Sequence, residues 1–485
     1  MALDEPKIQE IVEKVLQALQ QPGPEATSGS AGPASATQAR GPTSYVPTSG
    51  RYGVFGEVDS AIRAAREAFE QLQEMPLSDR DKMVEAIREV SRRNVREMSQ
   101  RTVTETGMGR VEDKINKTLL AANHTPGTAS MRPEAWSGDN GLTIMERAPY
   151  GVIGSITPCT NATETIICNA IGMLAAGNSV VFNTHPGAKE VSGYLIRILN
   201  QAIMAVGGPD NLLTVVAEPT IKSANLLMEH PDINLLVVTG GPGVVDVAMS
   251  KKKKVIAAGP GNPPALVDET AHLERTARSI VMGASLDNNI VCVVEKEIIA
   301  VKTIADKLKH HLGNSGAFIL RDSMISRLEK VVLNPKGGPN KEYVGKDASY
   351  ILKHAGIDVS GDPRIIVMEV DEKHRFVQDE LLLPVIPMVR VENADEGIAM
   401  SRRVEHNFRH TAVIHSTNIE NMHRMARAMN CSIFVKNAPS YAGLGLGGEG
   451  YPSFTIASPT GEGLTCTRHF SRERRCVLKD YFRIV

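Results

Sequence analysis

Short apolar runs alternate with helical stripes along the middle of the chain, from about residue 150 to residue 260. Apolar residues that run together predict buried strands, and apolar residues that recur every three or four positions predict helices. The first of these helices is predicted to end at Gly177, a typical helix terminator. The predicted strands cover 151–157, 179–183, 212–216, 234–241 and 254–258, and the predicted helices cover 164–177, 191–206, 220–230 and 244–250.

Repeated strand–helix–strand units predict a parallel, doubly wound α/β sheet with right-handed crossovers. Ligands of such sheets bind beyond the carboxyl ends of the strands. The glycine-rich turn Thr239–Gly243 follows a predicted strand and precedes a predicted helix. Glycines there let the backbone approach a phosphate, but the same turn also joins strands to helices where no ligand binds. Both interpretations stay open on this turn alone.

Two amphipathic helices are predicted before this region, and they are expected to cover the sheet. Ser60 is a candidate cap for the first, which carries Ile62 and Leu72 on one face, and the second runs from about Ser78. Further upstream, residues 5–20 show one apolar stripe typical of a helix, followed by a Gly-, Pro- and Ser-rich linker over 21–50. The apolar stripe favours a docking peptide. A helix that folds back on its own protein is an alternative, and a membrane-surface helix is disfavoured by mixed charge on the polar face.

Composition excludes several functional classes. The 485 residues include 54 Lys and Arg against 55 Asp and Glu, which argues against a nucleic-acid binder. No apolar run is long enough to predict a membrane-spanning helix. The six cysteines form no CxxC pair and no zinc-like spacing with histidine, so no metal site is predicted and a reducing compartment is favoured.

One cysteine is a candidate reactive thiol. Cys292 follows the polar turn Asp287–Asn289 and precedes an apolar segment predicted as a strand, so its thiol is expected at the edge of an element where it can face a cleft. A buried, inert cysteine is the alternative. Two other features are set aside: the GxGxxG at Gly443–Gly448 does not lie between a strand and a helix and is interpreted as a mobile loop, and Lys251–Lys254 is interpreted as a solvated helix end.

Over nearly all of residues 50–485 the chain resembles the aldehyde dehydrogenase superfamily. Within it, the chain is similar to the CoA-acylating acetaldehyde and propionaldehyde dehydrogenases of bacterial microcompartments. The segments that carry the resemblance are APYGVIGSITPCTNATET (148–165), VVFNTHPGAK (180–189), VVTGGPGVV (237–245), AAGPGNPPALVDETA (257–271), DNNIVCVVEKE (287–297), QDELLLPVIPM (378–388) and RHTAVIHS (409–416).

This resemblance implies a Rossmann-type cofactor domain over 51–259, a catalytic α/β domain over 260–450, and a C-terminal return over 451–485. The last segment and residues 131–147 are expected to build a small arm for a homo-oligomer, a dimer or a tetramer. The N-terminal helix, residues 1–20, resembles an encapsulation peptide, which implies docking to a shell protein. The expected location is therefore the lumen of a microcompartment in the bacterial cytoplasm.

The resemblance also implies the chemistry. Cys292 occupies the position of the catalytic cysteine, and Asn161 that of the asparagine that stabilises the oxyanion. A short aldehyde, propionaldehyde or acetaldehyde, would be oxidised through a thiohemiacetal and a thioester on Cys292. Hydrolytic relatives place a glutamate where this chain has Gly259, within a stretch from Ala257 to Gly261 that holds no carboxylate, so coenzyme A is the expected acyl acceptor.

The expected redox cofactor is NAD. No lysine is present near Asn183 to hold a 2′-phosphate, which favours NAD over NADP, and Glu380 matches the family's ribose-binding glutamate. His410 lies in a motif of the acylating group and is either a site residue or a structural histidine. The expected cofactor-binding residues are Thr157, Pro158, Asn183, His185, Thr239, Gly240, Gly241, Gly259 and Glu380.

Two other functions remain as alternatives. Aldehyde oxidation to a free acid would not depend on CoA. A non-catalytic scaffold that docks through its N-terminal helix would not need Cys292, and the joint presence of Cys292, Asn161 and Glu380 argues against it.

Overall fold

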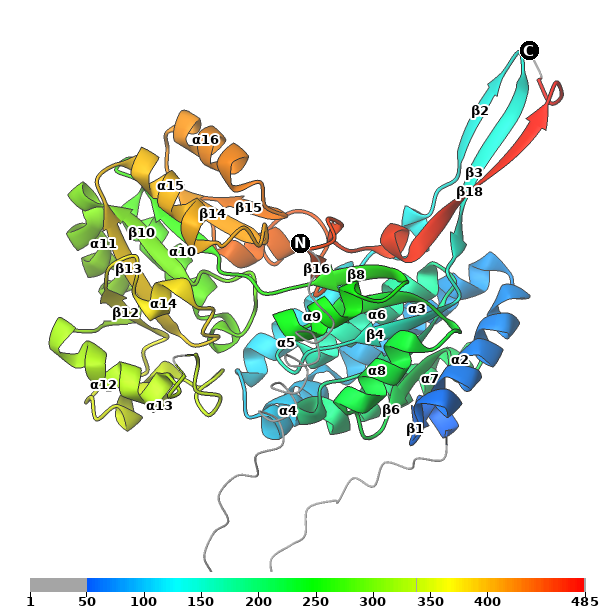
Figure 1. Cartoon of the computed structure of the whole chain (residues 1–485), viewed down its shortest axis with the longest axis horizontal. Coiled ribbons are helices and arrows are strands. Elements are labelled where there is room, and N and C mark those ends of the chain that lie inside the picture. Colours follow the sequence, from blue (N-terminus) through cyan, green and yellow to red (C-terminus); the bar gives the residue numbers. More distant parts are fainter. Residues whose placement is uncertain (1–49, 337, 484–485) are drawn as a thin grey trace, which may run out of the picture. The chain divides into compact units, whose positions relative to one another are not determined.

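The computed structural model describes residues 50–336 and 338–483, which belong to one compact unit (Figure 1). The helix predicted over 1–20 lies outside the described residues, as does the linker predicted over 21–50 except for Gly50. Within the described part of the chain, no helix is long and apolar enough to cross a membrane.

Six parallel strands form the first sheet, in the order β1-β6-β5-β4-β7-β8. This arrangement confirms the predicted parallel, doubly wound α/β sheet. The predicted bounds of two strands, 179–183 and 254–258, are those of β5 and β8. The strands are β1 (Val54–Phe55), β4 (Val152–Ile156), β5 (Ser179–Asn183), β6 (Leu213–Val216), β7 (Ile233–Thr239) and β8 (Lys254–Ala258).

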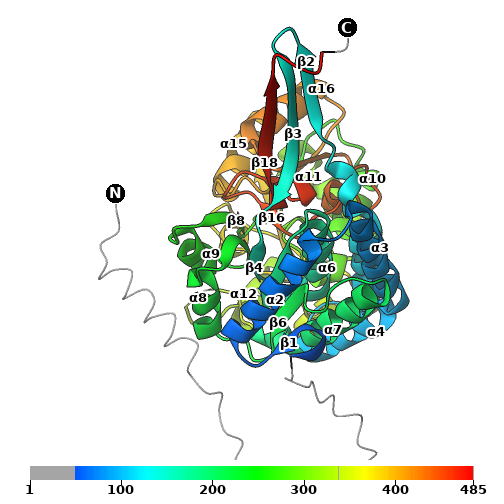
Figure 2. The ribbon, with the colours of Figure 1, turned by 90° about the vertical axis from the view of Figure 1, so that its right-hand side faces the viewer.

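Helices cover both faces of this sheet (Figure 2). On one face α2 (Val58–Gln73), α8 (Ile221–Glu229) and α9 (Pro242–Met249) pack into one apolar cluster with the strands. The opposite face is covered by α3 (Leu77–Arg93), α6 (Ala162–Ala175) and α7 (Lys189–Ala205), with α4 (Val95–Thr106) and α5 (Val111–His124) beside them. The predicted cap at Ser60 is wrong, because α2 begins at Val58 and Ser60 lies inside its first turn.

Seven parallel strands form the second sheet, in the order β11-β12-β13-β10-β9-β14-β15. Its strands are β9 (Pro264–Val267), β10 (Glu297–Val301), β11 (Ala317–Ile319), β12 (Ile365–Glu369), β13 (Val385–Val391), β14 (Thr411–His415) and β15 (Ile433–Lys436). Its helices are α10 (Leu273–Ala284), α11 (Lys302–Asn314), α12 (Asp322–Val332), α13 (Ala348–His354), α14 (Arg375–Gln378), α15 (Ala394–Val404) and α16 (Ile419–Met429).

The strand predicted to start at Cys292 begins only at Glu297, so Cys292 lies in a loop and not at a strand edge. Buried Lys296 explains the difference. Its ammonium donates to the main-chain carbonyls of Asn289 at 2.8 Å and Val291 at 3.3 Å, which folds this segment back on itself. An extended strand would carry these carbonyls out of reach of one side chain.

Two segments far apart in the sequence meet in a three-stranded antiparallel sheet (Figures 1 and 2). Strand β18 (Ser471–Lys479) pairs with β3 (Gly141–Pro149), which pairs with β2 (Glu134–Gly138). We call these three strands the arm. A short hairpin of β16 (Ile456–Ala457) and β17 (Gly463–Leu464) precedes β18 in the chain, and β16 packs beside β8.

The GxGxxG sequence and the run of four lysines both differ from simple loops or helix ends in the structure. Gly443 lies in a 3-10 helix, Ser440–Leu444, and no α-helix follows it, in agreement with the rejection of a dinucleotide motif there. The lysine run follows α9, but Lys254 starts β8 and the Lys253 ammonium donates to the carbonyl of Ile233 at 2.9 Å. The run is therefore only partly a solvated helix end.

Candidate active site

A backbone turn with an unusual conformation precedes Cys292. Asp287, Asn288 and Asn289 have φ angles of 49°, 55° and 69°, so three consecutive residues adopt the left-handed conformation. Each such residue costs on the order of 1 kcal/mol, although Asn and Asp tolerate it better than most. All three side chains are buried, and strain of this kind persists only where surrounding contacts hold it.

Two buried lysines on α5 hold the first residue of this turn. The ammonium groups of Lys114 and Lys117 lie 2.9 Å and 2.6 Å from Asp287 Oδ2. Burial by itself raises the pKa of the Asp287 carboxyl, but the two ammonium groups more than offset this effect and its pKa is lowered. Lys117 also pairs with Glu164 at 3.3 Å. The result is a buried ionic cluster that fixes the turn to α5 and α6.

Asn289 and Lys296 hold the other end of the turn. The Asn289 amide donates to the carbonyls of Ala284 at 2.7 Å and Glu295 at 3.0 Å, and its Oδ1 accepts from Lys296 Nζ at 2.8 Å. Cys292 therefore lies in a loop whose two ends are both fixed by buried polar side chains. Such support is what a positioned nucleophile requires.

Asn161 joins the same cluster at the start of α6. It is the N-cap residue of α6, it is 6% exposed, and its Oδ1 accepts from Lys117 Nζ at 2.6 Å. Since Lys117 also contacts Asp287, one ammonium links Asn161 with the turn before Cys292. The structure thus brings together the two segments that carry Asn161 and Cys292.

The thiol of Cys292 lies among ionisable groups. Burial raises its pKa to about 12, the negative charge of Glu380 acts in the same direction, and Lys296 opposes both. Glu380 itself has its pKa raised to about 7 by burial, against the effects of Lys296 and of a hydrogen bond from Gly261 N–H. The thiol is therefore protonated at neutral pH in this state, and its attack on a carbonyl carbon requires a proton acceptor.

His410 lies against the same loop. A Cβ placed on Gly261 would come within 2.9 Å of His410 Cγ and 3.0 Å of the Cys292 carbonyl oxygen, so these three residues are in close contact. Burial, aided by Lys296, lowers the pKa of His410 to about 4, and the ring is neutral at pH 7. Its Nδ1 is 2.9 Å from Thr411 Oγ1, whereas its Nε2 has no partner among the described residues.

The residues predicted to bind the cofactor are placed along one edge of the first sheet, at the carboxyl ends of its strands. Thr157 and Pro158 follow β4, Asn183 ends β5, Thr239 ends β7, and Gly259 follows β8. His185 follows β5, where its Nδ1 accepts from Gly187 N–H at 3.0 Å, while Gly240 and Gly241 lead into α9. This edge is where doubly wound sheets bind nucleotides.

Two observations support a nucleotide at this edge. The hydroxyls of Thr157 and Thr184 are buried without a partner among the described residues. No atom lies within 4 Å of a Cβ placed on Gly241 or Gly243, which leaves the main chain at the start of α9 open to a phosphate. Glu380 lies away from this edge, between α14 and β13, and its negative charge raises the pKa of the Cys292 thiol.

The stretch expected to align with the glutamate of hydrolytic relatives, Ala257 to Gly261, holds no carboxylate. A Cβ on Gly259 would lie 3.1 Å from Pro459 Cγ, a tight contact. Among the described residues, no group of three or more His, Cys, Asp or Glu side chains is placed to hold a metal ion.

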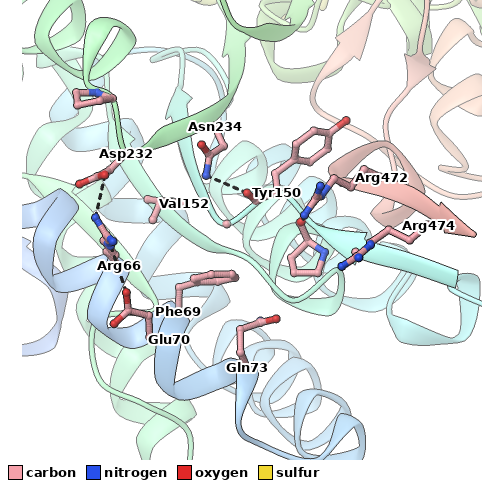
Figure 3. Close-up of a pocket in the computed structure, with 14 residues that line it drawn as sticks. Arg66, Phe69, Glu70, Gln73, Tyr150, Val152, Asp232, Asn234, Arg472 and Arg474 are labelled. Atoms are coloured by element: carbon pink, nitrogen blue, oxygen red, sulfur yellow. Dashed lines mark hydrogen bonds and ion pairs between the residues drawn. The ribbon is translucent and has the colours of Figure 1, made fainter. Parts of the chain in front are cut away.

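The cavity drawn in Figure 3 is separate from this cluster. It has a volume of about 430 Å³ and lies at the amino ends of β4 and β7, where the arm joins the first sheet. Its charged side chains include Arg66, which pairs with Asp232 at 3.0 Å, as well as Arg472 and Arg474 from β18. None of the predicted site residues lines it.

Lys114, Lys117 and Lys296 were not singled out by sequence reasoning. A signal was available for the first two: both lie on the inward stripe of α5, together with Leu120 and Ala121. A lysine on an inward helical stripe is seldom fully buried unless it is paired. Asp287, which contacts both lysines, and Asn161, which contacts Lys117, lie outside α5. The sequence gives no indication of these contacts.

The chain is similar to a known protein family and to individual members of it. The model of the "Aldehyde dehydrogenase family" matches residues 51–317 and 362–450. The acetylating acetaldehyde dehydrogenase EutE of Salmonella typhimurium is 48% identical over 439 residues, which cover 89% of this chain and 94% of that protein.

Solved structures are similar over the same length. A propionaldehyde dehydrogenase of Rhodopseudomonas palustris, with bound CoA and an acylated cysteine, has a TM-score of 0.87 and 50% identity over 88% of this chain and 98% of that one. A propionaldehyde dehydrogenase from the fucose utilisation microcompartment of Clostridium phytofermentans has a TM-score of 0.88 and 44% identity over 89% and 100%.

Two further structures of the Clostridium protein carry single substitutions to alanine, one of a cysteine and the other of a histidine. In that chain the two substituted positions are separated by the same number of residues as Cys292 and His410 are here.

Proposed function

The chain belongs to the aldehyde dehydrogenase family, and we propose that it oxidises a short aldehyde, propionaldehyde or acetaldehyde, to the acyl-CoA with NAD. One observation carries the choice of CoA over water as acyl acceptor. The main chain beside Cys292 is lined by Gly261 and a neutral His410, and the stretch from Ala257 to Gly261 offers no carboxylate to activate water. Relatives named as CoA-acylating enzymes that cover most of this chain support the proposal.

In the first step, the Cys292 sulfur forms a bond to the carbonyl carbon and the thiol loses its proton. Glu380 is the proposed acceptor, because its carboxylate charge raises the thiol pKa and its own pKa is about 7. Protonation of Glu380 removes that charge. The oxygen of the thiohemiacetal becomes negative, and the Asn161 amide and the Cys292 N–H are the proposed donors to it, each worth roughly 3 kcal/mol in comparable sites.

NAD supplies a hydride acceptor when it is bound. The role of this chain is to hold it at the carboxyl edge of the first sheet, with Thr157, Asn183, Thr239, Gly240 and Gly241 along the nucleotide. Before it accepts the Cys292 proton, ionised Glu380 can accept two hydrogen bonds from ribose hydroxyls as the nucleotide binds. Pro158, His185 and Gly259 complete the proposed lining. Loss of the hydride converts the thiohemiacetal into a thioester on Cys292.

In the last step the sulfur of CoA attacks this thioester and the Cys292 thiolate leaves. The CoA thiol must lose a proton for this attack. His410 is the proposed acceptor, because its ring packs against Gly261 beside the Cys292 loop and its Nε2 has no hydrogen-bond partner among the described residues. The matching spacing of the substituted cysteine and histidine in the Clostridium protein supports a role for both residues.

The proposed location is the lumen of a bacterial microcompartment, in line with the microcompartment origin of the Clostridium relative. Residues 1–20 would dock to a shell protein. A homo-oligomer is proposed through the arm, because nearly all of β18 and all of β2 are exposed, including Trp136 at 49% and Val477 at 61%.

The test is NADH formation from propionaldehyde and NAD, with and without CoA, for the wild type and for Cys292→Ser. We expect sustained turnover only with CoA, and its loss in the variant. Equal turnover without CoA would overturn acyl transfer in favour of hydrolysis. Activity that survives in Cys292→Ser would overturn the role of the thiol.

A further inference from the structure

The contact between Lys117 and Asn161 determines which way the Asn161 amide points. The oxygen and nitrogen of an asparagine side chain are nearly equal in shape, so contacts must decide their order. An ammonium group only donates hydrogen bonds. The atom 2.6 Å from Lys117 Nζ is therefore the amide oxygen, as the structure has it.

Fixing the oxygen leaves the amide nitrogen free to donate. Asn161 Nδ2 has one weak partner, Thr160 Oγ1 at 3.4 Å. A donor that is almost unpaired, on a side chain only 6% exposed, is expensive to maintain unless something else accepts from it. A negative oxygen formed on a substrate bound to Cys292 is such an acceptor.

The same ammonium fixes the position of this donor relative to the nucleophile. Lys117 Nζ is 2.6 Å from Asp287 Oδ2, at the start of the strained turn that leads to Cys292. Lys117 is 1% exposed, and the carboxylates of Asp287 and Glu164 balance the two ammonium charges of Lys114 and Lys117. A rigid, neutralised cluster thus connects the segment that carries the donor with the segment that carries the sulfur.

We propose that Lys117 is a positioning residue for the oxyanion site: it holds the Asn161 amide with its N–H groups toward the substrate oxygen, and it couples Asn161 to the Cys292 loop. This inference rests on the proposed function, in which Asn161 stabilises the oxyanion. Lys117 does not touch the substrate. A purely structural role would require only the Asp287 and Glu164 contacts.

Lys114 provides a matched control. It lies one turn earlier on α5, is 0% exposed and pairs with the same Asp287 oxygen at 2.9 Å, but its ammonium donates to the main-chain carbonyl of Thr160 at 3.5 Å and not to the Asn161 side chain. Lys114→Met and Lys117→Met each remove one buried ammonium from the same carboxylate. Both variants are expected to lower the melting temperature. The difference between them reports the loss of the Asn161 and Glu164 contacts of Lys117, and the Asn161→Ala background separates the first from the second.

The kinetic test compares kcat and KM for these two variants, for Asn161→Ala and for Lys117→Met/Asn161→Ala. We expect Lys117→Met to lower kcat about 10- to 100-fold, less than the roughly 100- to 1000-fold loss that follows removal of an oxyanion donor itself, with KM for the aldehyde little changed. Lys114→Met should lower kcat by no more than a few-fold. In the Asn161→Ala background, Lys117→Met should add less than a threefold further loss. Losses that multiply, or an equal loss in Lys114→Met, would overturn the proposal.

A second measurement separates this proposal from the proposed function. Crystal structures of the wild type and Lys117→Met show the Asn161 side chain whatever substrate the enzyme takes. We expect the amide to change rotamer, or to lose one ordered position, in Lys117→Met and not in Lys114→Met. An unmoved Asn161 amide would overturn the positioning role even for an active enzyme. A wild type that is inactive on short aldehydes would count against the proposed function alone.

Discussion

The His410 ring packs so closely against Gly261 that a Cβ at position 261 would lie 2.9 Å from His410 Cγ. The same Cβ would lie 3.0 Å from the carbonyl oxygen of Cys292, which belongs to the main chain and cannot simply rotate away. Glycine at 261 therefore allows the histidine and the nucleophile loop to approach each other. This packing places a neutral imidazole beside the sulfur-bearing loop.

The close packing leads to a prediction for Gly261→Ala. The added methyl group should displace either His410 or the Cys292 loop, so CoA-dependent turnover should fall at least tenfold, while the melting temperature falls by only a few degrees. Gly56→Ala is the control, because no atom lies within 4 Å of a Cβ placed there. Steady-state NADH formation and thermal unfolding of both variants check this. Unchanged turnover in Gly261→Ala would show that the close packing of His410 and the Cys292 loop against Gly261 is not needed for catalysis.

His410→Ala should separate the two half-reactions. If His410 takes the proton of the CoA thiol, the first turnover of NADH should survive in the variant, while steady-state turnover with CoA falls about 100-fold. Rapid-mixing measurements of NADH would show a burst followed by a slow phase.

The control for this prediction is His415→Ala. His415 is equally buried, its pKa is also lowered to about 4 by burial, and its Nε2 also has no partner among the described residues. The His415→Ala variant should be less stable than the wild type, but its NADH formation should show no burst followed by a slow phase. Loss of the burst itself in His410→Ala would place the histidine in the first half-reaction instead.

We expect buried Glu295 to make the stability of the protein depend on pH. Burial raises its pKa to about 7, although the Ser440 hydroxyl donates to Oε2 at 2.7 Å and opposes the effect. The unfolded chain loses this proton near pH 4.5, so between about pH 4.5 and pH 7 the unfolded state binds fewer protons than the folded state. Stability from this group is greatest at low pH, falls across that window and is level above it.

Glu295→Gln should remove this dependence. Relative to the wild type, the variant should gain stability between pH 5 and pH 8, by at most about 3 kcal/mol, since one pKa unit is worth about 1.4 kcal/mol. Urea unfolding of both proteins at the two pH values gives the difference. A difference that does not vary with pH would mean that the Glu295 carboxyl ionises normally.

If the arm forms the oligomer interface, a charge introduced on its strand β18 should weaken association of the subunits. Val477 on β18 is 61% exposed, and a charged residue within a strand that pairs across subunits should disfavour association. Val477→Glu should therefore shift the particle mass measured by light scattering toward the monomer. Leu77→Glu, at a residue 70% exposed on α3, should not. Equal masses for wild type and Val477→Glu would remove β18 from the interface.

Much of the first sheet could be predicted from apolar runs. Strands β5 and β8 were predicted with the bounds that the structure has, because nearly all of their residues are buried and read as short apolar runs, although β5 lies inside the sheet and β8 at its edge. The fold class and the resemblance to CoA-acylating aldehyde dehydrogenases are confirmed. The expectation that residues 131–147 and the C-terminal segment build one arm came from the resemblance alone. The pairing of β3 with β18 was not predicted, since strand pairing over such a separation leaves no local pattern.

The candidate site could be predicted only in part. Cys292, Asn161 and Glu380 were chosen by resemblance, and their roles remain proposals. The segment after Cys292 was expected as a strand because its valines are β-branched, yet the contacts of buried Lys296 with Asn289 and Val291 decide its conformation. Similarly, nothing local indicates that Lys117 reaches both Asn161 and Asp287. These are contacts between distant segments, which periodicity does not encode.

The central claim is that the acyl group waits on Cys292 until CoA accepts it. The most direct test is the intact mass of the enzyme after mixing with propionaldehyde and NAD without CoA, followed by addition of CoA. The account predicts a propionyl adduct that maps to Cys292 and that disappears as propionyl-CoA forms. Release of free propionate before CoA is added, with no adduct on Cys292, would contradict it.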